Sequence, residues 1–143
     1  SAGGNLAITL TDWIMNSNLK KPSNLILLSP WVDLELKNPD LKQSPSEQLL
    51  NKEDLQKAAI RFANQKGLKD PMISPLYHNN LKLPKTTIFS GDLDLLHNDI
   101  VLFSKNNPKT KLKTIKNMPH IHMIMPTKEA KITLKQVSDI LIC

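Results

Sequence analysis

Residues 86–96, TTIFSGDLDLL, carry the clearest structural signal in the sequence. The β-branched and aromatic residues of 86–90 predict a strand, which Gly91 ends. Two carboxylates, Asp92 and Asp94, follow in the loop just past the carboxyl end of this strand. Catalytic and ligand-binding groups collect at that end of the strands in open α/β sheets. The stretch therefore predicts an α/β fold with acidic side chains at its functional edge.

Helices and strands are predicted to alternate on both sides of this stretch. Before it, the pattern predicts a largely buried helix over 5–19, a strand covered on both faces over 25–28, and a helix over 51–66 that is capped by Asn51 and stopped by Gly67. After it, the pattern predicts a short helix over 99–105, a strand near the sheet edge over 112–115 and a helix over 127–141. The polar or proline-rich segments are expected to form loops, at 35–50 and 70–84.

The predicted order is helix, strand, helical insertion, strand, helix, strand, helix. Such alternation is typical of one parallel sheet with helices on both faces. The strands around Ile26, Ile88 and Lys113 are therefore expected to be neighbours. An open α/β sheet rarely begins with a helix, so we expect further strands of the same domain to lie upstream.

Length and composition limit the classes of protein to consider. At 143 residues the chain fits one domain of ordinary globular composition, and it has no apolar run long enough to span a membrane. The net charge of +6 comes from scattered lysines, with a single arginine and 4% aromatic residues, so no nucleic-acid partner is expected. The single cysteine, Cys143, excludes an internal disulfide and indicates a reducing, cytoplasmic compartment. No metal-ligand spacing or phosphate-binding loop occurs, so neither a metal nor a cofactor is expected.

The first seven residues, SAGGNLA, have the small side chains of a sharp turn at a helix start. One interpretation is the second half of a nucleophile elbow, in which Ser1 is the nucleophile and the N–H of Ala2 points into an oxyanion hole. A second is a phosphate-binding or plain helix start. A third is an N-terminal nucleophile that uses the α-amine of Ser1 as base, although such enzymes carry that residue on a strand. These seven residues alone leave the three interpretations open.

A histidine, His120, follows the last predicted strand. The chain order Ser1, Asp94, His120 is the order of nucleophile, acid and base in α/β-hydrolases. A histidine can take the serine proton near neutral pH, and a carboxylate holds the histidine in the correct tautomer. The sequence therefore contains the three residue types of a catalytic triad in a suitable order.

Other side chains compete for these roles. His122 competes for the role of base. Asp92 and Asp99 compete for the role of acid, although a turn residue and a carboxylate in the first turn of a helix are simpler explanations for them. His97 follows the acid loop and could line the site, whereas His78 is expected at the surface. Two further residues are expected to serve the local backbone and the packing, Ser29 and Trp31.

Five segments of the sequence occur in the order of a known family. They are SAGGNLA (1–7), LSPWVD (28–33), DPMISPL (70–76), the form G-x-x-D-x-L (91–96), and MPH (118–120) with MP and EA shortly after it. Together they resemble the hormone-sensitive-lipase-like serine esterases, which have the α/β-hydrolase fold. The resemblance implies a carboxylic ester hydrolase for small-molecule esters with short-to-medium acyl groups, and it implies no cofactor. It assigns Ser1 as nucleophile, Asp94 as acid, His120 as base and the N–H of Ala2 as an oxyanion donor, and it places part of a cap at about 35–75.

The resemblance begins at the serine. The Gly-Asp that precedes this serine in the family and the upstream H-G-G-G loop are not in the sequence. We therefore expect residues 1–143 to be the C-terminal part of a single α/β-hydrolase domain, whose open sheet edge self-associates or pairs with the missing N-terminal segment. With oxyanion donors missing, the fragment alone is expected to be weakly active or inactive. Two other hypotheses stay open, a non-catalytic small-ligand-binding module and a remnant of an interrupted gene.

Overall fold

Helices and strands alternate along the chain in the computed structural model, which describes residues 1–39, 45, 47 and 49–142. In chain order the elements are α1 (Ala2–Met15), β1 (Asn24–Leu28), α2 (Lys52–Ala63), the 3₁₀ turn η1 (Pro75–Tyr77), β2 (Lys85–Gly91), α3 (His97–Asn106), β3 (Thr110–Ile115), the 3₁₀ turn η2 (His122–Ile124) and α4 (Lys128–Ile142). This is the order of helices and strands that the sequence predicts. Part of the predicted loop over 35–50, and Cys143, lie outside the described residues.

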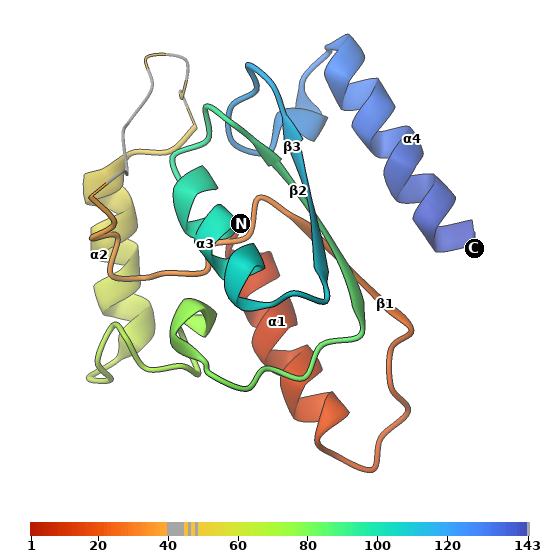
Figure 1. The fold of residues 1–143 in the computed structure, drawn as a ribbon. Coiled ribbons are helices and arrows are strands. Elements are labelled where there is room, and N and C mark those ends of the chain that lie inside the picture. The colour runs from red at the N-terminus through yellow and green to blue at the C-terminus, as the bar shows by residue number, and fades with distance from the viewer. Residues whose placement is uncertain (40–44, 46, 48, 143) are drawn as a thin grey trace.

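The three strands form one parallel sheet in the order β1-β2-β3. Leu28 pairs with Phe89 and Gly91 pairs with Ile115, so the carboxyl ends of the strands lie at one edge of the sheet. α1 and α3 lie on one side of the sheet and α4 on the other (Figure 1). The predicted parallel α/β architecture is confirmed, including the neighbouring strands and the edge position of β3.

β2 is the buried centre of the sheet. Every residue of this strand except the first is buried. Ile88 belongs to the same hydrophobic cluster as Ile100 and Phe103 of α3. Burying a side chain of this size stabilises the fold by about 1.5–3 kcal/mol. The strand that precedes the acid loop and the helix that follows this loop are therefore held together by apolar packing.

β1 is less buried than the sequence predicts. Only Leu27 of its five residues is buried, so the expectation of a strand covered on both faces is wrong. Its one partner is β2, and no strand in the described part of the chain pairs with its other edge. One sheet edge therefore leaves backbone N–H and C=O groups open to pairing.

α1 is shorter than predicted, because it ends at Met15 rather than near residue 19. The side-chain amide of Asn16 donates to the carbonyl of Asp12 at 2.9 Å, and the hydroxyl of Ser17 donates to that of Ile14 at 2.8 Å. Such side chains compete with backbone N–H groups for the last carbonyls of a helix. The apolar periodicity alone does not reveal this stop.

The apolar residues of α1 lie on two opposite faces. Ile8 is fully buried, whereas Leu6, Leu10 and Trp13 are 53%, 55% and 57% exposed. The spacing i, i+4, i+7 places these three residues on the face opposite Ile8. The prediction of a largely buried helix is wrong for the described chain, because the sheet contacts only one face of α1.

α2 begins as predicted and ends early. The side-chain oxygen of Asn51 accepts hydrogen bonds from the N–H groups of Glu53 at 2.8 Å and Asp54 at 3.3 Å. This N-cap pairs donors that have no acceptor within the helix. The helix stops at Asn64, which takes the left-handed conformation with φ 42°, and not at Gly67. Asparagine tolerates that conformation better than other residues with a side chain.

The loops that follow β2 and β3 meet at Gly91. A Cβ atom on Gly91 would lie 1.9 Å from the carbonyl oxygen of Met118 and 2.8 Å from that of Pro119. A side chain is therefore excluded here by backbone atoms, which cannot rotate away as a side chain could. This contact sets the distance between the loops that carry Asp94 and His120.

We expect Gly91→Ala to lower the free energy of unfolding by about 3 kcal/mol or more, since the new methyl group forces a backbone shift in a packed region. Urea unfolding of the variant and the wild-type protein measures this change. Gly67→Ala is the matched control, because a Cβ there has no atom within 4 Å. Equal unfolding midpoints for the Gly91→Ala variant and the wild type would contradict the close approach of the two loops.

Candidate active site

Asp94 lies in a tight turn between β2 and α3 and is 4% exposed. Its backbone N–H donates to the carbonyl of Gly91 at 3.3 Å, and its carbonyl accepts from the N–H of His97 at 3.0 Å. Its side-chain Oδ1 accepts a hydrogen bond from the N–H of Leu96 at 2.9 Å. Together these bonds fix the carboxylate at the carboxyl edge of the sheet.

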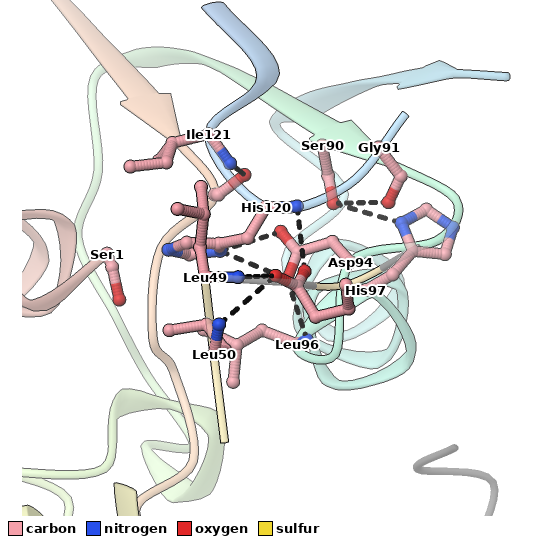
Figure 2. Close-up of polar contacts among 12 residues, drawn as sticks. Ser1, Leu49, Leu50, Ser90, Gly91, Asp94, Leu96, His97, His120 and Ile121 are labelled. Atoms are coloured by element: carbon pink, nitrogen blue, oxygen red, sulfur yellow. Dashed lines mark hydrogen bonds and ion pairs between the residues drawn. The ribbon is translucent and has the colours of Figure 1, made fainter. Parts of the chain in front are cut away.

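His120 points its ring at this carboxylate (Figure 2). Its Nδ1 lies 3.1 Å from Oδ1 and 3.0 Å from Oδ2 of Asp94, and both side chains are buried. With Asp94 ionised, Nδ1 carries the hydrogen and Nε2 keeps a free lone pair. An imidazole held in this tautomer can accept a proton at Nε2. The structure thus brings together the two residues that the sequence predicts as acid and base.

The loop that carries His120 is bound to the acid loop through backbone groups. The N–H of Asn117 donates to Oδ1 of Asp92 at 2.6 Å, and the N–H of Leu93 donates to the carbonyl of Met118 at 3.0 Å. Asp92 therefore binds the backbone of the histidine loop and not the imidazole. Asp92 does lie in the turn after β2, but its side chain bonds a loop 25 residues away and not the turn itself.

Ser1 is the N-cap residue of α1 and lies beside the loop that follows β1. Its carbonyl accepts hydrogen bonds from the N–H groups of Gly4 at 3.0 Å and Trp31 at 3.1 Å. Its amino group donates to the carbonyl of Leu28 at 3.3 Å. A Cβ on Gly4 would lie 2.8 Å from Cβ of Pro30, so a glycine lets the first turn of α1 approach this loop. The backbone of Ser1 is therefore anchored to the end of β1.

The ring of His120 lies between Asp94 and Ser1 in Figure 2, with its second nitrogen on the side of Ser1. No hydrogen bond between described residues joins Ser1 Oγ to this ring. Burial lowers the pKa of the Ser1 amino group, and the negative charge of Asp94 opposes this shift.

Ala2 is the first residue of α1 and is exposed. The N–H of a first helical residue has no acceptor within its own helix. The partial positive charge of the helix N-terminus adds to its attraction for an anion. The N–H of Ala2 is therefore of the kind that can donate a hydrogen bond to an anion.

The other histidines have different partners. His122 is fully buried, and its Nε2 lies 3.0 Å from Oγ1 of Thr133 on α4. His97 places its Nδ1 3.0 Å from Oγ of Ser90 and lies on the other side of Asp94 from His120 (Figure 2). Burial lowers the pKa of both side chains, which favours their neutral forms. His122 and His97 thus serve contacts within the fold.

The contacts of two residues beside His120 are not predicted from the sequence. The expectation that Ser29 bonds its local backbone is wrong, because its Oγ accepts from the N–H of Ile121 at 3.2 Å, 92 residues away. Glu47 is 4% exposed, and its Oε2 accepts from the N–H of His120 at 2.8 Å. Both contacts join distant segments, and no local pattern marks either residue.

Asp99 is a second buried carboxylate near the acid loop, 1% exposed and in the first turn of α3. Its Oδ1 accepts from the side-chain amide of Asn38 at 2.7 Å, and its Oδ2 has no hydrogen-bond partner among the described residues. Burial raises the pKa of Asp99 to about 6, although the bond from Asn38 opposes this. Its partner lies in the segment before α2, so Asp99 is not paired with the histidine loop.

In the described ranges, no group of three His, Cys, Asp or Glu side chains is arranged to hold a metal ion. No described helix combines the length and the apolar character that crossing a membrane requires.

Known proteins resemble this chain in sequence and in fold. The profile of the alpha/beta hydrolase fold family matches residues 1–124. A triacylglycerol lipase of Mycobacterium tuberculosis is 30% identical over 102 residues, which cover 71% of this chain and 19% of that protein. An esterase of Acinetobacter venetianus is 32% identical over 117 residues, which cover 79% of this chain and 38% of that protein.

Two solved structures resemble the fold of this chain at 26% sequence identity. A hormone-sensitive lipase from a metagenome library superposes with a TM-score of 0.87, over 96% of this chain and 48% of that one. EstE7, a homologue of that lipase class from a metagenome library, superposes with a TM-score of 0.86, over 96% and 50%. The chain thus spans about half the length of these structures and less than two fifths of the two curated relatives. It belongs to the α/β-hydrolase fold family and, within it, to the hormone-sensitive-lipase-like esterases.

The raised pKa of Asp99 predicts a pH-dependent effect of Asp99→Asn. Below the ordinary value of 3.8 the carboxyl group is protonated in both the folded and the unfolded state, so burial carries no ionic cost. Above about 6 it is ionised in both states, and burying the charge costs about 3 kcal/mol. We therefore expect Asp99→Asn to raise the free energy of unfolding by up to about 3 kcal/mol at neutral pH, and by much less near the ordinary pKa.

Urea unfolding at about pH 7.5 and about pH 4 measures this difference, which develops across the pKa range of the carboxyl group. Asp139→Asn is the control, because Asp139 is an exposed carboxylate on α4. An equal effect of Asp99→Asn at both pH values would contradict the electrostatic origin of the change.

Proposed function

We propose that the protein to which residues 1–143 belong hydrolyses carboxylic esters with short-to-medium acyl groups, through Ser1, His120 and Asp94. The observation that carries this proposal is the buried pair of His120 and Asp94, at 3.0 and 3.1 Å, with Ser1 on the other side of the ring. Asp94 and His120 come from loops at one edge of a parallel sheet, and Ser1 caps a helix bound to the end of β1 at the same edge, where catalytic groups collect in this class of fold. Their chain order is that of α/β-hydrolases.

In the proposed mechanism Ser1 Oγ attacks the ester carbonyl carbon while Nε2 of His120 takes the hydroxyl proton. Asp94 holds the tautomer and stabilises the imidazolium that forms. His120 then gives the proton to the departing alcohol, which leaves an acyl group on Ser1. In the second step a water molecule gives a proton to the same nitrogen and attacks the acyl group. His120 then returns this proton to Ser1 Oγ as the bond to the acyl group breaks and the carboxylic acid leaves. The N–H of Ala2 donates to the oxyanion in both steps, and the mechanism needs no cofactor.

The names of the relatives support the substrate class. They are an esterase and a triacylglycerol lipase, both of which act on ester bonds. A further solved relative, EstE5, was soaked with p-nitrophenyl butyrate, and it is 26% identical with a TM-score of 0.79. Short p-nitrophenyl esters are therefore suitable test substrates for this chain.

We also propose that the protein is cytoplasmic, because its single cysteine is typical of a reducing compartment.

We assign the segment over 35–75, part of which lies outside the described residues, to a cap over the site. In Figure 1 its helix α2 lies farther from the sheet than α3. A helix outside the layers of the sheet is free to cover the carboxyl edge and shape an acyl pocket. The rest of residues 1–143 forms the C-terminal part of one α/β-hydrolase domain in this proposal.

We further propose that a strand of the whole protein from outside residues 1–143 pairs with the open edge of β1. The amino group of Ser1 donates to the carbonyl of Leu28, as the N–H of a strand residue beside β1 would. The exposed apolar face of α1, formed by Leu6, Leu10 and Trp13, indicates that more chain packs beside this edge. Pairing between two copies of residues 1–143 is the alternative, and size-exclusion chromatography of these residues alone distinguishes the two.

The triad is tested in the protein encoded by the complete gene. We expect this protein to hydrolyse p-nitrophenyl acetate and butyrate, and Ser1→Ala or His120→Gln to lower kcat by about 10⁴-fold or more. Asp94→Asn is expected to lower kcat by about 10⁴-fold, because it favours the wrong tautomer of the histidine. Ser138→Ala is the control, since Ser138 is exposed on α4. Absence of hydrolysis of any short acyl ester, together with tight binding of small ligands, would replace this proposal with a non-catalytic binding module.

Residues 1–143 alone are expected to hydrolyse the same esters at least about 10²–10³-fold more slowly than the complete protein, because each missing oxyanion donor has an effect of that size. The measurement compares initial rates at equal concentrations of the two proteins. Circular dichroism spectra check that each protein is folded. Equal rates would show that no further segment contributes to the site.

A further inference from the structure

Glu47 is an unusual carboxylate because it is 4% exposed and all its described partners are backbone N–H groups. Its Oε2 accepts from the N–H of His120 at 2.8 Å, and its Oε1 accepts from the N–H groups of Leu49 at 2.9 Å and Leu50 at 3.1 Å. No lysine or arginine forms an ion pair with it in the part of the chain that the structure describes. Burying a carboxylate is costly unless donors replace its water, and three N–H groups do so here.

The two oxygens of Glu47 have different tasks. Oε1 binds N–H groups two and three residues further along the chain, which closes a local turn before α2. Oε2 binds a residue 73 positions away, in the loop after β3. The second bond is not needed to build the turn. It joins the segment between β1 and α2 to the candidate base.

Glu47 is the described acceptor for the backbone N–H of His120. Pro119 has no N–H, and Ile121 takes the left-handed conformation with φ 40°, which is strained for a β-branched residue. The close approach at Gly91 restrains the loop before His120, and the bond from the N–H of Ile121 to Ser29 restrains the residue after it. The bond to Glu47 acts at His120 itself.

The contact with Asp94 does not by itself place the imidazole. The ring turns about two side-chain torsions, so a hydrogen bond at Nδ1 orients it only if the backbone of His120 is fixed. A displacement of His120 by about 1 Å lowers the rate of a positioned reaction by roughly 10²-fold. A backbone anchor at this residue consequently affects the direction in which Nε2 faces Ser1.

We propose that Glu47 is a positioning residue for His120, whose carboxylate holds the backbone of the base so that the ring bonds Asp94 and faces Ser1. The inference rests on the proposed esterase function and adds to it a residue that touches neither substrate nor the reacting atoms. The bond joins Glu47, which lies between β1 and α2, to the candidate base, just as Ser29 joins the same part of the chain to Ile121.

Glu47→Asp separates the two tasks. An aspartate at position 47 keeps the negative charge and can still bind the N–H groups two and three residues on, as aspartate does in turns. It is one methylene shorter and cannot also reach His120. Glu53→Asp is the matched control, because it removes one methylene from an exposed glutamate at the start of α2.

In the protein encoded by the complete gene, we expect Glu47→Asp to lower kcat for p-nitrophenyl butyrate by about 10- to 100-fold, with KM changed by less than about twofold. The thermal unfolding midpoint should stay close to that of the wild type, and Glu53→Asp should change neither property. In an Asp94→Asn background the same substitution should lower kcat by less than about threefold, because residues that act through one base are not additive.

Four other outcomes would contradict the proposal, and they lead to three different conclusions. A Glu47→Asp variant that keeps the kcat of an active wild type shows that Glu47 does not position the base, while the esterase function stands. A full additive loss in the Asp94→Asn background points to the same conclusion. If Glu47→Asp does not fold, Glu47→Gln is measured instead, since its amide keeps the length of the side chain and one acceptor. Unfolding of both variants assigns Glu47 to the fold alone, and a wild type without esterase activity removes both proposals together.

Discussion

Parallel pairing on both sides of β2 is the constraint on which the candidate site depends. The three strands end at one edge of the sheet, so the loops that follow them meet there and supply Ser29, Asp94 and His120. A slip of one residue along β3 would move the histidine loop by about 3.3 Å. The 3.0 Å contact between the ring and the carboxylate could not survive such a slip. The close approach at Gly91 reinforces the register, because it leaves no room for the two loops to shift against each other.

The sequence predicts the parts of this arrangement that depend on local chemistry. A strand that ends in a carboxylate loop, the N-cap at Asn51 and the helix–strand order all arise from neighbouring residues, and the structure has each of them. The structure also pairs His120 and Asp94. In the sequence, only their positions after strands and the family resemblance indicate these two residues. The errors at α1 have a different origin. Helical periodicity identifies an apolar face, but it cannot tell which of two such faces packs against the sheet.

The contacts of Ser29 and Glu47 cannot be predicted from neighbouring residues in the sequence. Their hydrogen-bond partners lie 92 and 73 residues away, and neither belongs to a periodic pattern. A glutamate in a polar, proline-containing segment is ordinarily a solvated side chain. Its burial becomes visible only when the sheet brings the segment after β1 next to the loop after β3. The second layer of a site is thus less predictable than the first, because its residues act through backbone groups that every residue has.

Four carboxylates are buried among the described residues, namely Asp33, Glu47, Asp94 and Asp99, and none of them forms an ion pair with a described lysine or arginine. Asp94 is bonded by an imidazole and a backbone N–H, and Glu47 by three backbone N–H groups. Asp99 has one amide donor and an oxygen with no partner among the described residues, and burial raises its pKa to about 6. Both carboxylates that contact His120 thus have a donor on each oxygen, and such fixed partners preorganise a proton-accepting side chain. Asp33 has donors on both oxygens as well, from Glu35 and Tyr77. On the other side of the ring, β1 has an open edge and α1 an exposed apolar face. The described chain thus fixes Asp94 and His120, the proposed acid and base, and we expect the geometry of Ser1, the proposed nucleophile, to depend on what packs against β1.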